Sequence, residues 1–192
     1  ITLVEENAGH AFNAIETGSS EYSKLIRKNE EIIDFTNSEL TKFLIKLSVD
    51  VEESDENTIG SYFHVLNDLE RIGDHAMNLA DYIKMLVNQD VYFSDRAIGE
   101  IVVMKETAQK SMDLLVGDKR EQANELLVNV SKAEQKIDDM TDAYRTAQMD
   151  RMKNTTCAPE ASIIYAHMLT DFERVGDHLL NIAEDFAKMY SK

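Results

Sequence analysis

Four pairs of carboxylates, each pair separated by four residues, are the groups in this sequence best placed to do chemistry. Two pairs lie in each half of the chain: Glu30 and Asp34, Glu70 and Asp74, Glu134 and Asp138, Glu173 and Asp177. On an α-helix, residues four apart lie on one face, about one turn from each other. Each pair therefore presents two negative charges to the same neighbour, where they repel unless a cation, a proton or an arginine compensates them.

The numbering of the pairs suggests that they meet. If the two helices that carry the pairs in one half are antiparallel, the first member of the upstream pair is level with the second member of the downstream pair. This holds in the first half for a chain reversal at residue 52 and in the second half for a reversal between residues 155 and 156. We therefore expect two clusters of four carboxylates, one in each half.

Clusters that offer only carboxylate oxygens suit hard multivalent ions. Iron, manganese, magnesium and calcium fit this ligand type, and zinc fits it less naturally. The sequence therefore predicts cation sites at the eight carboxylates. The alternative is a solvated polar stripe in which Arg71 and Arg174, each next to one of the pairs, supply the counter-charge.

An internal repeat places these clusters in equivalent elements. The segment YFHVLNDLERIGDHAMNLADY, Tyr62 to Tyr82, recurs 103 residues later as YAHMLTDFERVGDHLLNIAEDF, Tyr165 to Phe186, without a gap. A fainter match upstream relates EEIIDFT, which begins at Glu30, to EQKIDDMT, which begins at Glu134. The chain is therefore expected to consist of two copies of one unit.

Apolar residues with alternating spacings of three and four run through both copies, which is the pattern of an amphipathic helix. Turn residues interrupt this pattern at few places, so we predict six helices, at 2–17, 20–50, 57–88, 94–116, 119–153 and 159–190. The predicted fold is all-α, with two tandem three-helix bundles. We expect the first bundle to cover residues 1–90 and the second residues 91–192.

Composition supports a helical protein and limits its partners. The 192 residues include only 7 Gly and 1 Pro, too few for the turns of an all-β protein of this size. The net charge of −16 argues against nucleic acid and anionic membranes as ligands, and favours cations or a basic protein partner. No apolar run reaches the ~20 residues that span a bilayer. The single cysteine, Cys157, indicates a reducing compartment.

A second repeated pattern contains histidine. His64, Asp68 and His75 lie on one stripe of the third predicted helix, and His167, Asp171 and His178 repeat this stripe in the sixth. The stripe lies away from the carboxylate edge, so we predict hydrogen bonding between helices or between the two halves. A surface that binds a partner or an oxyanion is the alternative. Gly73 and Gly176, in mid-helix, indicate either close helix packing or space beside the carboxylates.

The segments DLERIGDHAMNLAD and DFERVGDHLLNIAED, with EEIID and EQKID upstream, resemble the PhoU family over the whole chain. The resemblance implies a tandem pair of three-helix bundles with two E/D-x-x-x-D motifs in each. It implies a non-enzymatic regulator of phosphate uptake and the phosphate-starvation response, whose motifs bind metal, with iron as the first choice. The motif positions map onto all eight residues: Glu30, Asp34, Glu70, Asp74, Glu134, Asp138, Glu173 and Asp177.

A closer resemblance is to the PhoU-like C-terminal domain of bacterial Na/phosphate cotransporter family proteins, carried by YFHVLNDLERIGDHAMNLAD and the CAPEASIIYAHMLTDFERVGDHLLNIAED stretch. It implies that the partner is the membrane domain of a phosphate transporter, which can belong to the same chain, or a sensor kinase. The expected location is the cytoplasm, at the inner face of the cell membrane. A homodimer is compatible with this assignment.

Two other classes of protein remain as alternatives. A carboxylate-bridged di-iron oxidase or ferritin-like protein would need Glu-x-x-His on two helices, whereas His75 follows Glu70 at the fifth position and His178 follows Glu173 in the same way. The other alternative is a metal-free acidic helical scaffold.

Overall fold

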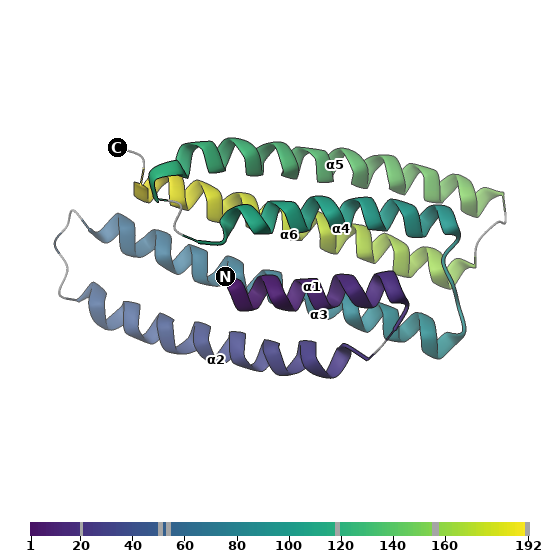
Figure 1. Cartoon of the computed structure of the whole chain (residues 1–192), viewed down its shortest axis with the longest axis horizontal. Coiled ribbons are helices and arrows are strands. Elements are labelled where there is room, and N and C mark those ends of the chain that lie inside the picture. Colours follow the sequence, from purple (N-terminus) through teal and green to yellow (C-terminus); the bar gives the residue numbers. More distant parts are fainter. Residues whose placement is uncertain (20, 50–51, 53–54, 118–119, 155–157, 191–192) are drawn as a thin grey trace.

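In the computed structural model the described residues, 1–19, 21–49, 52, 55–117, 120–154 and 158–190, form six α-helices and one 3₁₀ turn (Figure 1). The all-α prediction is therefore confirmed. The elements are α1 (Thr2–Thr17), α2 (Ser23–Ser48), α3 (Glu56–Gln89), α4 (Asp95–Leu115), the 3₁₀ turn η1 (Arg120–Gln122), α5 (Ala123–Lys153) and α6 (Pro159–Tyr190).

Local signals in the sequence account for the helix ends. Gly18 ends α1 and Asp90 ends α3, both in the left-handed conformation, with φ of 62° and 53°. The Ser94 side chain caps α4 by accepting a hydrogen bond from the Ala97 amide at 3.3 Å. Pro159 opens α6, where its missing N–H does no harm.

Two helices begin later than predicted. The second was expected from residue 20, but α2 begins at Ser23, because the Ser19 hydroxyl accepts the Glu21 amide at 3.2 Å and favours a turn. The fifth was expected from residue 119, but the tighter turn η1 comes first and α5 begins at Ala123. The expected chain reversal at residues 155 and 156 lies outside the described residues, as does Cys157.

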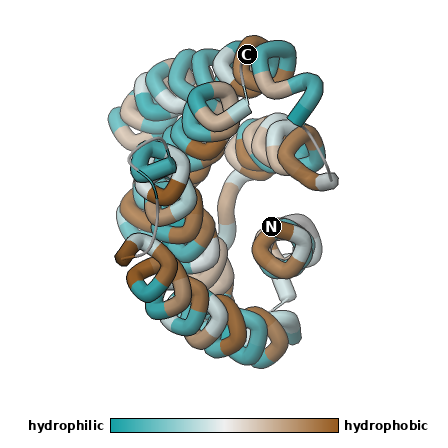
Figure 2. Tube along the Cα trace, turned by 90° about the vertical axis from the view of Figure 1, so that its left-hand side faces the viewer, coloured by the Kyte–Doolittle hydropathy of each residue, from teal (hydrophilic) through white to brown (hydrophobic). Residues whose placement is uncertain are grey.

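The helices form a curved row in the order α2, α3, α6, α5, with α1 and α4 packed against one face of it (Figure 2). The two copies of the repeat are thus joined through α3 and α6. The α2–α3 hairpin and the α5–α6 hairpin point towards opposite ends of the molecule (Figure 1).

One continuous hydrophobic core runs through both halves. Phe12 of α1 stacks on Phe172 of α6 across the halves, with ring centroids 5.6 Å apart. In the first half of α6 the predicted apolar seam is fully buried, with Tyr165, Leu169 and Phe172 each at 0% exposure. The division into domains at residues 1–90 and 91–192 stays a prediction. None of the described helices combines the length and apolar character that a bilayer crossing requires.

Candidate metal centres

The hairpins position the carboxylate pairs as the sequence predicts. Glu30, which is buried, and Asp34, which is exposed, come from α2; the antiparallel helix α3 packs against it and carries Glu70 and Asp74. The second hairpin has the same arrangement: Glu134 and Asp138 lie on α5, and Glu173 and Asp177 lie on α6. In each half the four predicted carboxylates thus lie close enough for their charges to interact. We call the group in the first half the N-terminal cluster and the group in the second half the C-terminal cluster.

Glu30 is the buried centre of the N-terminal cluster. Its side chain is only 4% exposed, because Gly73 of α3 lacks the Cβ that would fill this space. A Cβ on Gly73 would lie 2.6 Å from Glu30 Oε2, which is far inside contact distance. Of the two readings of this glycine, space beside the carboxylate is therefore the correct one.

The polar groups around Glu30 leave it incompletely satisfied. Asn7 of α1 is fully buried and donates from Nδ2 to Glu30 Oε2 at 3.4 Å. Glu30 Oε1 and Asn7 Oδ1 have no hydrogen-bond partner among the described residues. A buried carboxylate oxygen without a partner is costly unless a proton or a cation reaches it.

Repulsion is strong in this cluster. Burial, followed by the charges of its three carboxylate neighbours, raises the pKa of Glu30 to about 7. Burial and the charge of Asp74 also raise the pKa of Glu70, although Arg71 opposes this shift. Arg71 lies 3.8 Å from Glu70 and 3.7 Å from Asp74, but it is half exposed, so it compensates them only partly.

In the C-terminal cluster three carboxylates are already gathered for a shared ligand. Glu134, Asp138 and Asp177 each offer one oxygen, and these oxygens lie within 4.8 Å of one another. Among the described residues this is the one group of three or more candidate ligand side chains with that geometry. Burial, then the charges of Asp138 and Asp177, raise the pKa of Glu134.

Asp138 resembles Glu30 of the other half in two respects, a raised pKa and a buried oxygen without a hydrogen-bond partner. Burial, then the charges of Glu173 and Asp177, raise its pKa. Its Oδ1 is buried and has no hydrogen-bond partner among the residues that the structure describes. The C-terminal cluster therefore also contains an oxygen that a cation would satisfy.

Gly176 plays a different part from Gly73. A Cβ there would meet Ile137 Cδ1 at 3.3 Å and Glu134 Cγ at 3.8 Å, so this glycine allows α5 and α6 to pack closely. The mid-helix glycine of the first half therefore leaves space beside a carboxylate, whereas that of the second half allows close helix packing.

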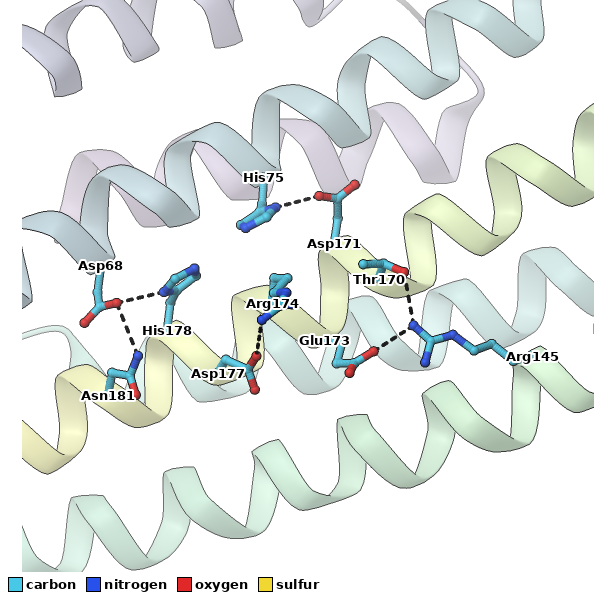
Figure 3. A network of polar contacts seen from close by, with 10 residues as sticks. All are labelled: Asp68, His75, Arg145, Thr170, Asp171, Glu173, Arg174, Asp177, His178 and Asn181. Atoms are coloured by element: carbon cyan, nitrogen blue, oxygen red, sulfur yellow. Dashed lines mark hydrogen bonds and ion pairs between the residues drawn. The ribbon is translucent and has the colours of Figure 1, made fainter.

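An arginine forms a shorter ion pair with a carboxylate of the C-terminal cluster than Arg71 forms in the N-terminal one. Arg145 of α5 donates from Nη2 to Glu173 Oε2 at 2.8 Å and also to Thr170, which holds Glu173 at the edge of the cluster (Figure 3). Arg174 lies 3.4 Å from Asp177. The fourth predicted ligand, Glu173, is therefore an ion-pair partner here as well as a neighbour of Asp138.

The histidine stripe joins the two halves. His178 Nδ1 lies 2.7 Å from Asp68 Oδ1, and His75 Nδ1 lies 2.5 Å from Asp171 Oδ1 (Figure 3). The two imidazoles stack, with centroids 5.6 Å apart. The same aspartates accept amide hydrogen bonds from Asn181 and Asn78, respectively. The prediction of hydrogen bonding between the halves is confirmed.

Sequence reasoning missed one buried polar network. Glu100 of α4 is 8% exposed and accepts from Arg151 Nη2 at 2.7 Å and from the Tyr165 hydroxyl. Its partners are 51 and 65 residues away, so no spacing signals the contact. One signal exists in the repeat: Arg151 stands where the first half has Leu47, 104 residues earlier.

The donor set fits a multivalent cation. Both clusters offer carboxylate oxygens only, each has a buried oxygen without a partner, and in each half burial and mutual repulsion raise carboxyl pKa values. This combination suits a hard ion better than a nitrogen or sulfur ligand set would.

Comparison with known proteins gives consistent matches. The chain matches the PhoU domain family over residues 1–83 and 101–186. It is 25% identical to "Phosphate-specific transport system accessory protein PhoU homolog 1" of Thermotoga maritima, over 95% of this chain and 79% of that protein. It is 24% identical to the "Phosphate-specific transport system accessory protein PhoU homolog" of Clostridium acetobutylicum, over 95% of this chain and 84% of that protein.

Two solved structures share the fold. The crystal structure of PhoU from Pseudomonas aeruginosa superposes with a TM-score of 0.88 at 23% identity, covering 98% of this chain and 90% of that one. The phosphate transport system regulatory protein PhoU from Streptococcus pneumoniae gives a TM-score of 0.85 at 23% identity, covering 98% and 88%. These likenesses support the two-repeat helical architecture described above.

Proposed function

The chain belongs to the PhoU family, and from this premise we propose that it is a non-enzymatic regulatory protein of phosphate transport. The observation that carries the proposal is the match of both halves to the PhoU domain. The relatives' names support it, because they describe accessory proteins of a phosphate-specific transport system.

We further propose that the two carboxylate clusters hold multivalent metal ions, with iron as the first choice and manganese, magnesium, calcium or zinc as alternatives. In the C-terminal cluster Glu134, Asp138 and Asp177 would hold the ion, with Glu173 at its edge. In the N-terminal cluster the four ligands would be Glu30, Asp34, Glu70 and Asp74. A bound cation would supply the positive charge that these carboxylates lack.

The protein's own contribution is to couple that charge to helix packing. The ligands of each cluster come from two antiparallel helices, so holding them together resists separation of the hairpin. Without a cation the same carboxylates repel across the helix interface. Occupancy of the clusters therefore alters the stability of the surface that a partner would meet.

We propose that the partner is the membrane domain of a phosphate transporter, in the same chain or a separate one, or a sensor kinase, met at the inner face of the cell membrane. The net charge of −16 supports a partner with basic surface. A homodimer is compatible with this role.

The histidine contacts argue against the di-iron oxidase alternative. His75 and His178 are committed to Asp171 and Asp68 of the opposite half. Each of them also follows the nearest motif glutamate, Glu70 or Glu173, by five residues, whereas such a centre takes its histidines from Glu-x-x-His motifs. The metal-free scaffold is separated from the proposal by the experiment below.

The proposal is tested in a bacterium that lacks its own PhoU protein. Wild-type protein should restore normal phosphate uptake and repression of the starvation response. The triple variant Glu134→Gln/Asp138→Asn/Asp177→Asn should fail to do so at equal expression. A matched control, Glu125→Gln/Asp150→Asn/Glu184→Gln, removes three exposed carboxylates from the same two helices and should behave as wild type.

Failure of the wild-type protein to restore regulation in a host that accepts a known PhoU protein would contradict the regulatory role. Full function of the triple variant would contradict the part given to the metal and favour the acidic scaffold.

A further inference from the structure

The helix α1 reaches the N-terminal cluster through one side chain. Asn7 is fully buried and donates from Nδ2 to Glu30 Oε2 at 3.4 Å, whereas the four predicted ligands of this cluster come from α2 and α3. Figure 2 shows α1, which begins at the label N, packed against one side of the curved row of helices. The N-terminal cluster is therefore in contact with all three helices of its half.

This contact gives the two carboxylate oxygens of Glu30 different surroundings. Oε2 accepts the hydrogen bond from Asn7, whereas Oε1 has no hydrogen-bond partner among the described residues. A carboxylate that binds a metal ion is commonly hydrogen-bonded by a second residue, which fixes its orientation and supports the affinity of the site. Asn7 is placed to do this for Glu30, because it holds one oxygen and leaves the other for the ion.

The junction of α1 and α2 around this contact is incompletely satisfied. Asn7 Oδ1, Glu30 Oε1 and Asn29 Nδ2 are buried and have no hydrogen-bond partner among the residues that the structure describes. Buried polar atoms without a partner oppose the packing that buries them. Segments that are packed in this way are among those that open locally before the rest of a protein unfolds.

The internal repeat shows that the second half is built differently at this point. The buried apolar positions of α1 recur 100 residues later in α4, so that Thr107 stands at the position of Asn7. The Thr107 hydroxyl donates to the Val103 carbonyl oxygen at 2.9 Å within α4 and accepts from Lys136 Nζ at 3.3 Å. Among the described residues no hydrogen bond joins α4 to the four carboxylates of the C-terminal cluster. The ion pair of Glu100 with Arg151 fixes α4 to the second hairpin instead.

We propose that Asn7 is a positioning residue for metal binding at the N-terminal cluster, and that occupancy of this cluster controls how firmly α1 is docked. When α1 is docked, Asn7 orients Glu30 and raises the affinity of the cluster for its ion. By thermodynamic linkage, the bound ion strengthens the docking of α1 by the same factor. The C-terminal cluster has no such link to α4. This inference rests on the proposed metal binding and assigns a regulatory role to the first cluster alone.

Two backgrounds separate the clusters for the test. Glu134→Gln/Asp177→Asn leaves the N-terminal cluster as the proposed metal site, and Glu30→Gln/Asp74→Asn leaves the C-terminal cluster. Each protein is titrated with Mn²⁺ in a calorimeter. The first background reports the affinity of the cluster that Asn7 contacts, and the second reports the affinity of the cluster that it does not contact.

Asn7→Leu is then introduced into both backgrounds, because leucine keeps the branched shape of the side chain and removes its amide. We expect Mn²⁺ binding to weaken by about 10–100-fold at the N-terminal cluster. At the C-terminal cluster it should stay within about twofold. Thr107→Val is the matched control on α4 and should leave both affinities within about twofold. Asn7→Ser, whose hydroxyl is too short to replace the amide, serves as a second variant if circular dichroism shows Asn7→Leu to be unfolded.

Amide hydrogen exchange tests the docking of α1. In the background that keeps the N-terminal cluster, saturating Mn²⁺ should slow exchange in α1 by about tenfold or more beyond any slowing in α4. In Asn7→Leu the response of α1 to Mn²⁺ should fall to that of α4. A residue that only stabilised the core would change exchange equally with and without Mn²⁺, so this comparison separates positioning from a purely structural role.

Three results would overturn this inference alone. They are equal Mn²⁺ affinity of the N-terminal cluster with and without the Asn7 amide, an equal loss of affinity at both clusters in Asn7→Leu, and exchange in α1 that responds to Mn²⁺ no more than exchange in α4. The absence of binding of both Mn²⁺ and Fe²⁺ in the two backgrounds and in the wild type would overturn the proposed metal sites, and this inference with them. The complementation test of the regulatory role is independent of these outcomes.

Discussion

The two carboxylate clusters occupy equivalent places in the repeat but differ in how deeply their carboxylates are buried and in how arginine compensates their charges. The N-terminal cluster buries Glu30 against Gly73 and has one half-exposed arginine nearby. The C-terminal cluster is more open, packs Gly176 against Ile137, and ties Glu173 to Arg145. A repeated motif therefore conserves the position of charges along helices, while the surrounding side chains decide how much repulsion remains.

The two hairpins differ in a related way. The second is covered by α4 and stabilised by the Glu100, Arg151 and Tyr165 network, whereas the first leaves apolar side chains exposed at its end. The polar residues of the second hairpin satisfy one another within the chain. The first hairpin has apolar residues, Leu47 and Ile59, at the positions of Arg151 and Ser162.

The largest effect should come from breaking the polar network of the covered hairpin. Glu100→Gln leaves the Arg151 guanidinium, which is 11% exposed, without its carboxylate, and should lower the free energy of unfolding by about 3 kcal/mol. Leu47→Ala, at the position equivalent to Arg151, should cost less than about 1 kcal/mol because Leu47 is already 42% exposed. Urea denaturation of both variants measures the difference, and equal costs would contradict the contrast between the hairpins.

Neutralising one carboxylate in each cluster should stabilise the metal-free protein. In chelator at pH 8, Glu30→Gln should raise the free energy of unfolding by about 1–2 kcal/mol, because it removes a buried, repelled charge. Glu134→Gln should raise it by less, because Glu134 is only partly buried. Thermal unfolding of the two variants checks the order. A larger gain from Glu134→Gln would show that the C-terminal cluster carries the greater repulsion.

The Glu100 network should also make stability depend on pH. Burial alone would raise the Glu100 pKa, but hydrogen bonds from Arg151 and Tyr165 outweigh it, so the pKa lies below its ordinary value. A carboxyl group with a lowered pKa contributes stability above its unfolded pKa of about 4.3, and this contribution is lost as pH falls through the folded pKa.

The difference in stability between wild type and Glu100→Gln should therefore be constant near neutral pH. It should shrink below about pH 4.5, since a protonated Glu100 resembles glutamine. Urea denaturation at several pH values measures it. A difference that does not change between pH 7 and pH 3 would show that the charge of Glu100 is not the source of the stability.

Alanine at the two mid-helix glycines gives the smallest and most specific contrast. Gly176→Ala should stabilise α6 by up to about 1 kcal/mol, less the cost of a 3.3 Å contact with Ile137. Gly73→Ala gains the same helix propensity but must displace the Glu30 carboxylate. We expect it to leave stability within about 1 kcal/mol of wild type and to weaken metal binding at the N-terminal cluster alone. Calorimetric metal titration of both variants decides, and equal affinities would contradict the role given to Gly73.

Much of the fold and of the site was predictable from the sequence because the relevant signals are local or repeated. Gly18, Ser94 and Pro159 mark helix ends by their own chemistry. The spacing of the carboxylate pairs, combined with the antiparallel hairpins, predicted that each set of four would gather. The repeated histidines likewise predicted hydrogen bonding between helices or between the halves, and the structure supplies its partners, Asp171 and Asp68.

What the sequence did not predict depends on contacts that occur only once. Asn7 reaches Glu30 from α1, whereas the equivalent residue of α4, Thr107, accepts from Lys136 instead, and the Glu100 network joins residues of α4, α5 and α6 that are far apart in the sequence. The depth at which Glu30 is buried depends on how closely α1, α2 and α3 pack, which periodicity does not specify. A polar residue at an apolar position of the repeat, such as Arg151 opposite Leu47, is the sequence signal that would have pointed to the network.

The central claim, that both clusters hold metal, is tested most directly by the metal content of protein purified without chelator or nickel affinity. Wild type should be measured beside Glu30→Gln/Asp74→Asn and Glu134→Gln/Asp177→Asn by plasma mass spectrometry. The account predicts about two or more ions of iron or another multivalent metal per chain, with the loss of about half of them in each double variant. Less than about a tenth of an ion per chain in the wild type, even after reloading, would contradict it.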